Sequence, residues 1–528
     1  MAGALGDVMV LDLSRVLAGP YATQLLGDFG ARVIKVEQPG SGDDTRRWGP
    51  PFTANGESAY FFCANRNKES ITVNLKHPDG LAVVRALAQQ ADVLVENFKP
   101  GTLARLGLDP VDLRAANPGL IVCSITGYGQ TGPLRDRPGY DTAIQALGGI
   151  MSITGPAGPD GAPMKVGVAV VDITAGLNAA VAILAALHRR TLTGQGQIID
   201  IALFDTQLSW LANVATAYLV SGEPPQRYGN GHASIVPYQT MPTADGWLML
   251  AVGNDGQFAA LCRELDRAEL AGDPRFATNP QRVAHRAELI PQLAARFATA
   301  TTDAWVDRLS AAGVPCSPVN DIPTALDHPQ ARAREMVQTV AHPQTGPIRV
   351  LGPVAKLSDT PAAITAPPPL LGEHTDAVLR ELLGFDAAPP RRCTPTARSS
   401  PAHAYMFVQR LFSAHALVRR AEPKQGPAPA VRTWACELNA MQRPPTCLFS
   451  TPSCAGPCQS KAPLRLTARG RADSTQCSAT HMSVQCTPRA HGRANARPPL
   501  RLSGRWACGL NAMQRPPLHP FTERPHVR

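Results

Sequence analysis

The stretches Val93-Leu-Val95 and Leu120-Ile-Val-Cys-Ser-Ile125 decide the fold. Both are short and apolar at consecutive positions, which is typical of strands that helices cover on both faces of a parallel sheet. Asp79–Gln90, just before the first run, has the spacing of an amphipathic helix. The alternation of strands and helices therefore predicts an α/β domain with a doubly wound parallel sheet.

The same pattern continues on either side of these two runs. Toward the N-terminus we expect strands over Val8–Leu13, Val33–Glu37 and Ile71–Leu75, and a helix over Gly19–Phe29. Toward the C-terminus we expect a helix over Ile173–Arg190 with Asp172 as its N-cap, a strand over Gln197–Leu203 and a helix over Phe204–Leu219.

Composition shifts divide the chain into four parts. A Pro-rich stretch at Gly222–Tyr228 is typical of a linker. We predict a large α/β domain that begins with 1–221, a small α+β domain with its linkers over 222–330, and a return to the large domain over 331–386. The remaining residues, 387–528, form a tail.

The basic charge of the chain belongs to this tail. The formal net charge is +10, but 387–528 alone hold 21 Lys and Arg against 4 Asp and Glu. Residues 1–386 hold 30 against 37 and are therefore mildly acidic. The net charge is thus no argument that the body of the protein binds nucleic acid.

The tail carries a repeat: most of Trp434–Pro445 recurs in Trp506–Pro517. Both copies are rich in Pro and Arg and poor in aliphatic residues, so they lack an apolar face on which repeats could stack. We predict a disordered tail. A remote alternative is a nucleic-acid-binding tail, but few aromatics and no recognition motif accompany its Arg residues, and we expect no nucleic-acid partner.

The cysteines and the apolar runs of residues 1–386 indicate in which cellular compartment the protein works. The four cysteines of this part are scattered, which predicts neither a disulfide frame nor a zinc site. No run of 18 or more apolar residues is present, and the N-terminus lacks the pattern of an export or organelle signal. We expect a cytoplasmic protein with no membrane association and no metal.

Three features have both a structural and a functional interpretation. Gly127-Tyr-Gly129-Gln-Thr-Gly132 matches a dinucleotide fingerprint, but Pro133 and Pro138 break the helix that must follow, which favours a glycine turn beside a ligand. Asp172 is either a helix cap or a carboxylate nucleophile, and the two roles are compatible because a helix dipole favours the ionised form. Gly229-Asn230-Gly231-His232 is either a plain turn or a lid.

Arginines gather in the predicted loops and helix ends of the first domain: Arg46, Arg47, Arg105, Arg135 and Arg137. A single arginine in such a place is most simply a solvated surface residue. As a set, they could bind phosphates or a substrate carboxylate.

Together these residues resemble the family III CoA-transferases, the group that includes formyl-CoA transferase. The match runs from about Val8 to Leu383. It is carried by Arg15-Val-Leu-Ala-Gly-Pro20, Gly30-Ala-Arg-Val-Ile-Lys-Val-Glu37, Pro39-Gly-Ser-Gly-Asp43, Asn65-Arg-Asn-Lys-Glu-Ser70, Val95-Glu-Asn-Phe98, Thr126-Gly-Tyr-Gly129, Arg137-Pro-Gly-Tyr-Asp141, Thr193-Gly-Gln-Gly196 and Leu371-Gly-Glu-His-Thr375.

The resemblance implies a Rossmann-like, CoA-binding large domain built from both ends of the body and an interlocked homodimer. It places the catalytic carboxylate on Asp172, with no tightly bound cofactor and with CoA as a substrate. The implied CoA contacts are Val16, Ala18, Val73, Asn74, Leu75, Lys76, Asn97, Phe98 and Arg105. The expected substrate and lid residues are Arg46, Arg47, Arg137, Tyr140, Gly229, Asn230, Gly231 and His232.

Within this family the likeness is to members that move CoA from succinyl-CoA to glutarate or hydroxymethylglutarate. It rests on Asp43-Asp-Thr-Arg46 and Trp48-Gly-Pro-Pro51, on Cys123–Pro133, and on His232-Ala-Ser-Ile-Val-Pro-Tyr-Gln239. Formyl-CoA transferase carries an amide at the position of Leu17 and a basic residue at that of Gln38, which argues against formate and oxalate. The alternative is an α-methylacyl-CoA racemase, but racemases carry a His-Asp pair after the glycine that is Gly139 here.

Overall fold

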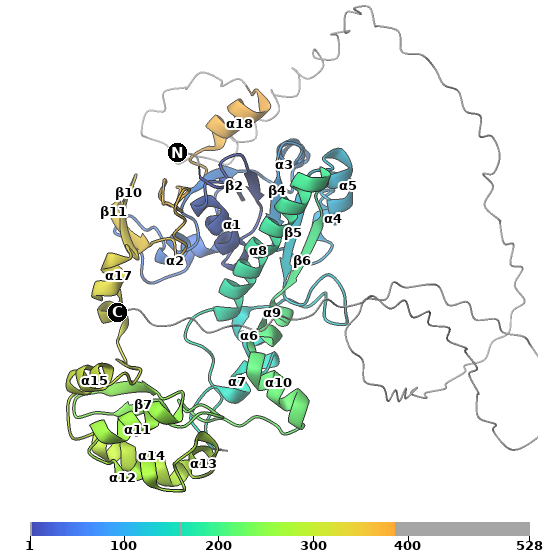
Figure 1. Ribbon diagram of the computed structural model, residues 1–528. Helices are drawn as coiled ribbons and strands as arrows, with labels where there is room; N and C mark the ends of the chain where they lie inside the picture. Colours follow the sequence, from blue (N-terminus) through green and yellow to red (C-terminus); the bar gives the residue numbers. More distant parts are fainter. Residues whose placement is uncertain (1–2, 159, 386–528) are drawn as a thin grey trace, which may run out of the picture. The chain divides into compact units, whose positions relative to one another are not determined.

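The structure, a computed structural model, describes residues 3–158 and 160–385. Its centre is a six-stranded, all-parallel sheet in the order β3-β2-β1-β4-β5-β6 (Figure 1). The strands are β1 (Met9–Asp12), β2 (Arg32–Glu37), β3 (Lys68–Thr72), β4 (Val93–Glu96), β5 (Ile121–Thr126) and β6 (Ile198–Ala202). The prediction of a doubly wound α/β fold is confirmed. The predicted tail lies outside the described residues.

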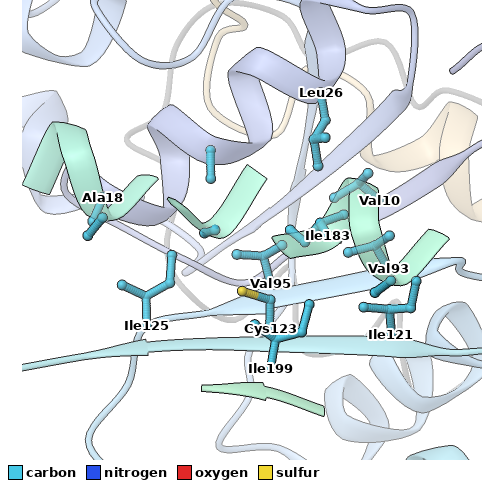
Figure 2. Close-up of a cluster of buried hydrophobic side chains, with 14 of the residues drawn as sticks. Val10, Ala18, Leu26, Val93, Val95, Ile121, Cys123, Ile125, Ile183 and Ile199 are labelled. Atoms are coloured by element: carbon cyan, nitrogen blue, oxygen red, sulfur yellow. The ribbon is translucent and has the colours of Figure 1, made fainter. Parts of the chain in front are cut away.

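Alternate residues of each strand enter two separate cores, because successive side chains point to opposite faces of a sheet. Val10, Val93 and Val95 pack against α1 (Ala18–Asp28) and α8 (Val170–Thr193), and Figure 2 shows this cluster. Leu11 and Leu94 face the other way, toward a second helical layer. That layer consists of α3 (Pro78–Ala88), α4 (Thr102–Arg105), α5 (Pro110–Ala116) and α18 (Thr375–Leu383).

Helix α8 is long and apolar enough to cross a membrane by length and composition alone, but half of its most apolar stretch is buried within the protein. Its buried residues include Ala175, Ala179 and Ile183, which belong to the core beneath α1. A helix that packs into the core of a domain satisfies the same criteria as a membrane span. Burial therefore accounts for the apolar character of this face of α8.

Helix α8 begins three residues before the predicted start, so Asp172 is not its N-cap but the third residue of its first turn. The predicted helix over Phe204–Leu219 is two helices, α9 (Leu203–Trp210) and α10 (Ala212–Ser221), because the chain breaks at Ala212, whose φ is 36°. The apolar periodicity runs through this break, and a single positive φ leaves no signal in the pattern.

Short elements connect the larger ones along this first part of the chain. They are η1 (Asp44–Arg47), α2 (Ala59–Phe62), α6 (Asp141–Leu147) and α7 (Ile150–Ile153). Helix α6 begins only at Asp141, well after the Gly127–Gly132 motif, so the described chain has no helix start at the point where a dinucleotide fingerprint requires one.

A second, antiparallel sheet follows in the order β7-β8-β9, from β7 (Tyr238–Pro242), β8 (Trp247–Ala251) and β9 (Cys316–Pro318). It has its own core, to which Leu248, Phe258 and Trp305 belong. The helices of this part are α11 (Asp255–Glu264), α12 (Glu269–Gly272), α13 (Asn279–Ala284), α14 (Arg286–Phe297) and α15 (Thr302–Ala311). The predicted boundaries at 222, 331 and 387 stay predictions.

The last described segment reaches the edge strand of the parallel sheet. It contains α16 (Ile322–Asp327), α17 (Pro329–Ala333) and the hairpin of β10 (Val337–His342) and β11 (Gly346–Leu351). Beyond the hairpin, His374 Nδ1 and Thr375 Oγ1 accept hydrogen bonds from the backbone N–H groups of Ser70 and Thr72. These bonds fix the segment beside β3.

Candidate active site

The strand order of the parallel sheet predicts where the site lies. β1 and β4 are neighbours, but the chain leaves β1 toward β2 and leaves β4 toward β5, so a crevice opens at their carboxyl ends. Asn97 closes the base of this crevice: its Oδ1 accepts a hydrogen bond from Arg15 N–H (3.0 Å) and its Nδ2 donates to Arg15 O (2.6 Å).

A cavity of about 180 Å³ lies at this crevice and holds Asp172. It is lined by Arg15, Val16, Leu17, Ala18, Asn97, Phe98, Lys99, Pro100, Ile125, Thr126, Gly127, Arg137, Pro138, Gly139, Tyr140, Asp172 and Leu203. The structure therefore brings seven of the predicted site residues together around one space. We refer to it as the Asp172 cavity.

A second cavity of about 260 Å³ opens beside the first, at the carboxyl ends of β2 and β3. It contains the whole predicted stretch Val73, Asn74, Leu75 and Lys76, and we call it the Lys76 cavity. Arg15 and Phe98 line both cavities, and the Arg15 guanidinium lies 6.0 Å from the centre of the Phe98 ring. The two cavities thus share one wall.

Asp172 is positioned by a residue from another element. Asp141 Oδ1 accepts hydrogen bonds from the backbone N–H groups of Val171 (2.8 Å) and Asp172 (3.4 Å), which are free donors at a helix start. Gln145 in turn donates to Asp141 Oδ2 (2.6 Å). Asp141 therefore caps α8 from the start of α6.

Burial raises the pKa of the Asp172 carboxyl from 3.8 to about 7, and the nearby Asp141 carboxylate adds to the rise. The dipole of α8 favours an ionised Asp172, as we expected from the sequence, but burial and the charge of Asp141 oppose it and are larger. A carboxylate with a pKa near 7 is poorly solvated in its charged form and ready to react. Such groups are typical of active sites.

The glycines beside this cavity are needed for close packing. A side chain on Gly127 would lie 2.6 Å from the Gly139 backbone, so the two segments approach each other more closely than any other residue allows. This contact brings the segment with Arg137 and Tyr140 against the end of β5. The motif at Gly127 is therefore a turn beside the cavity, as the sequence favoured.

Several predicted residues lie outside both cavities. Arg46 is buried, donates to Glu37 and to the Pro369 carbonyl, and stacks 3.7 Å from the Phe61 ring centre. Arg47 is exposed beside Asp44.

Arg105 and the predicted lid also lie outside the cavities. Arg105 donates to Thr102 on its own helix, and Thr102 lines the Lys76 cavity. The turn Gly229–His232 is held by Arg286, which donates to the His232 carbonyl, and by a bond from Asn230 to Thr240.

Two residues near Asp172, Asp141 and Tyr60, were not predicted as site residues from the sequence. Burial raises the pKa of Tyr60 to about 12, and the charges of Cys63, Asp172 and Asp141 add to the rise, so this tyrosine lies within electrostatic reach of Asp172. Tyr60 has no local signal. Asp141 ends the family motif Arg137–Asp141, but its relation to Asp172 arises only in the fold. Among residues 3–158 and 160–385, no three His, Cys, Asp or Glu side chains form a group that could hold a metal.

Comparisons with known proteins identify the family of the chain. The model of CoA-transferase family III matches residues 5–375. Succinate–glutarate CoA-transferase of Agrobacterium fabrum is 49% identical over 389 residues, 72% of this chain and 95% of that protein. Succinyl-CoA:glutarate CoA-transferase of Mus musculus is 47% identical over 382 residues, 72% of this chain and 87% of that protein.

Among solved structures, a CaiB/BaiF family protein from Brucella suis has 46% identity and a TM-score of 0.65. The match covers 72% of this chain and 100% of that one. The resemblance found in the sequence is confirmed, and the chain belongs to CoA-transferase family III.

Proposed function

We propose that this enzyme moves CoA from succinyl-CoA to a dicarboxylate such as glutarate or hydroxymethylglutarate, with Asp172 as the nucleophile. The observation that carries the proposal is the Asp172 carboxyl, with its raised pKa, in the wall of a cavity that shares Arg15 and Phe98 with a second cavity. The names of relatives 47 and 49% identical to this chain supply succinate and glutarate. Hydroxymethylglutarate rests on the resemblance found in the sequence.

CoA would lie across both cavities. Its phosphates would occupy the Lys76 cavity, where Lys76 and Arg15 supply positive charge, with Arg105 on the helix that carries Thr102. The pantetheine arm would pass the wall of Arg15 and Phe98, and the thioester would reach Asp172. This placement uses the crevice at the strand ends, where open α/β sheets bind their ligands.

The reaction must keep the energy of the thioester, which a carboxylate nucleophile allows. Asp172 attacks the thioester carbonyl of succinyl-CoA, forms a mixed anhydride and releases the CoA thiolate. The thiolate attacks the Asp172 carbonyl, so that succinate leaves and an aspartyl-CoA thioester remains. The acceptor carboxylate then repeats both steps in reverse, and Asp172 is regenerated. Backbone N–H groups beside the cavity would stabilise each tetrahedral oxyanion.

The distal carboxylate of each acid needs a cation. Arg137 lines the Asp172 cavity, whereas Arg46 already pairs with Glu37 and Arg47 is exposed beside Asp44. Arg137 is therefore our first candidate for this contact, and Tyr140 lies next to it in the cavity wall. The turn Gly229–His232 lies outside both cavities, so as a lid it would have to move over the Asp172 cavity to exclude water.

A homodimer is part of the proposal. Val181 on α8 and Leu219 and Val220 on α10 are 65, 80 and 83% exposed, although all three are aliphatic. Strongly exposed aliphatic residues are typical of a protein–protein interface when they gather in one patch. Light scattering should give twice the chain mass for the wild type and a lower mass for Val181→Glu.

The test of the function uses the full chain with succinyl-CoA and a panel of carboxylic acids. We expect mass spectrometry to find glutaryl-CoA or hydroxymethylglutaryl-CoA. Without an acceptor, it should find CoA bound to the peptide that contains Asp172. Both signals should vanish in Asp172→Asn. No acyl-CoA product from any acid, together with exchange of the α-proton of a 2-methylacyl-CoA, would instead favour racemase chemistry.

A further inference from the structure

The loop Ser14–Leu17 lies between the two cavities, and its backbone is strained. Val16 has a φ of 70°, in the left-handed region that a β-branched residue rarely adopts. Such a conformation persists only where its surroundings fix it, and it is common at functional sites. Val16, Leu17 and Ala18 all line the Asp172 cavity, so the shape of this loop sets one wall of the reaction site.

A buried ion pair holds the strained residue. The N–H of Val16 donates to both oxygens of the Asp43 carboxylate, each at 3.2 Å. Lys35 donates to Asp43 Oδ2 and to the Ser14 carbonyl, each at 2.9 Å. The side chains of Lys35 and Asp43 are both 1% exposed, so neither bond competes with water.

The electrostatics of the pair support a fixed charge on Asp43. Burial raises the pKa of its carboxyl, but Lys35 and the hydrogen bonds from Thr45 outweigh burial, so that the pKa lies below the ordinary value. The carboxylate remains ionised at neutral pH and accepts strong, charge-assisted bonds. The other backbone groups of the loop are also held, since Ser14 N–H donates to Asp12 and Arg15 is bound on both sides by Asn97.

We infer that Asp43, paired with Lys35, is a positioning residue for CoA transfer: it holds Val16 in the left-handed conformation that shapes one wall of the Asp172 cavity. This inference rests on the proposed reaction at Asp172. Asp43 and Lys35 line the Lys76 cavity, but their polar atoms bind the loop. Asp43 therefore acts through Val16.

The same domain offers a matched control at the other end of α1. Asp28 is buried like Asp43 and accepts two hydrogen bonds from Arg66, at 2.9 and 2.6 Å. Neither Asp28 nor Arg66 lines either cavity. Asp28→Asn and Asp43→Asn thus remove the same charge from two buried ion pairs, of which one touches the loop.

The experiment compares both variants in the full chain by their kinetics and thermal unfolding. We expect both to lower the melting temperature. Asp43→Asn should also lower kcat by about 10- to 100-fold, since a misplacement of about 1 Å costs on the order of 100-fold. Asp28→Asn should leave the kcat of the folded enzyme unchanged. A rise in the KM for succinyl-CoA with unchanged kcat would instead assign Asp43 a role in binding alone and overturn the inference.

A second substitution tests the mechanism. Glycine adopts a φ of 70° without strain, so Val16→Gly should make the loop less dependent on Asp43. We expect Asp43→Asn to lower kcat by less than about threefold in the Val16→Gly background, a non-additivity that contacting residues show. An equal loss of kcat in both backgrounds would contradict a role through Val16.

Asp43→Glu covers the case in which Asp43→Asn does not fold. It keeps the charge beside Lys35 but lengthens the side chain, so we expect near wild-type stability with a lowered kcat. Wild-type kcat in this variant would overturn the inference. The results also distinguish the proposed reaction at Asp172 from the positioning role of Asp43. Activity in Asp172→Asn would refute the reaction site itself. An inactive Asp172→Asn with equal kcat in Asp43→Asn and Asp28→Asn would refute only the positioning role.

Discussion

The Asp172 cavity and the Lys76 cavity share a wall but are built in different ways. The Lys76 cavity takes most of its lining from loops that follow β1, β2, β3 and β4, including the continuous stretch Val73–Lys76. The Asp172 cavity joins such loops to the first turn of α8 and to the segment Arg137–Tyr140. The Lys76 cavity is therefore formed mainly by the parallel sheet and its loops, whereas the Asp172 cavity also depends on contacts between distant segments.

This difference predicts how each cavity responds to substitution. In the Lys76 cavity, the exposed stretch around Lys76 is positioned by β3 alone, whereas the buried Lys35 and Asp43 act on the loop Ser14–Leu17. A residue in the Asp172 cavity acts together with others, since Asp172 depends on Asp141 and Asp141 on Gln145. Single changes should therefore be costly around Asp172 and at the Asp43–Lys35 pair, and mild at the exposed Lys76.

The largest effect is expected for Asp172→Asn. The amide has nearly the same shape but no nucleophilic oxygen, so kcat should fall by at least about 10⁴-fold, the scale seen when a catalytic nucleophile or its partner is lost. Binding of CoA, measured by calorimetry, should change little because the Lys76 cavity is intact. Loss of CoA binding in this variant would contradict the assignment of CoA binding to the Lys76 cavity and of the reaction to the Asp172 cavity.

The same variant should be more stable than the wild type. With a pKa of about 7 in the folded state and 3.8 unfolded, Asp172 binds a proton in the native state that the unfolded chain releases. Its contribution to stability therefore falls as pH rises from about 4 to 7, by a few kcal/mol at most. Asp172→Asn removes this cost, so its melting temperature should rise by several degrees at pH 8 and much less at pH 4.5.

The next effect is expected for Asp141→Asn. The amide can still cap α8 through its oxygen, but it cannot accept the bond from Gln145, so Asp172 should shift and kcat should fall by roughly 10- to 100-fold. Loss of the Asp141 charge also lowers the pKa of Asp172. The acid limb of the kcat/KM profile, centred near pH 7 in the wild type, should move to lower pH.

A suitable control for this variant is Asp109→Asn. Asp109 caps α5 by accepting a bond from the Val111 N–H, and it lines neither cavity. Its substitution weakens a helix cap without touching Asp172, so the pH profile should stay in place. A matching shift in both variants would show that general destabilisation, not the Asp141 charge, moves the profile.

The same contrast explains how far the sequence could predict the site. The parallel sheet follows from local apolar runs, whereas Val73–Lys76 and Asn97–Phe98 were expected at the site only from the family resemblance. Asp172 itself was marked by the helix pattern and by the family resemblance. Asp141 and Tyr60 could not be found, because their relation to Asp172 exists only after α6 and α2 have packed.

The arginines show what the sequence could not predict, namely which of two similar residues reaches the site. Arg46 and Arg137 are alike in sequence, since both lie in polar, Pro- or Gly-rich stretches. In the fold, Arg46 is held by Glu37 and Phe61, whereas Arg137 lines the Asp172 cavity. A charge pattern predicts that a guanidinium is present but not which carboxylate it meets, because the partner comes from a distant strand.

A smaller effect is expected in the Lys76 cavity. Lys76→Met should raise the KM for succinyl-CoA by roughly three- to tenfold and leave kcat unchanged. The effect is this small because Lys76 is exposed, and water weakens its charge-assisted contact with the substrate. The effect should shrink as ionic strength rises, because salt screens an exposed charge. A fall in kcat instead would show that the two cavities do not act separately.

The smallest effect is expected at the shared wall. Burial raises the pKa of Glu96 to about 7, and its carboxyl accepts a bond from the Phe98 N–H (2.7 Å), so Glu96 titrates in the same range as Asp172. Glu96→Gln keeps an oxygen acceptor for Phe98, and kcat/KM should change by less than about threefold. The pH profile should stay near 7, since Asp172 governs it. If the profile moved in Glu96→Gln and not in Asp141→Asn, the titrating group would be Glu96, and the wall between the cavities would control the reaction.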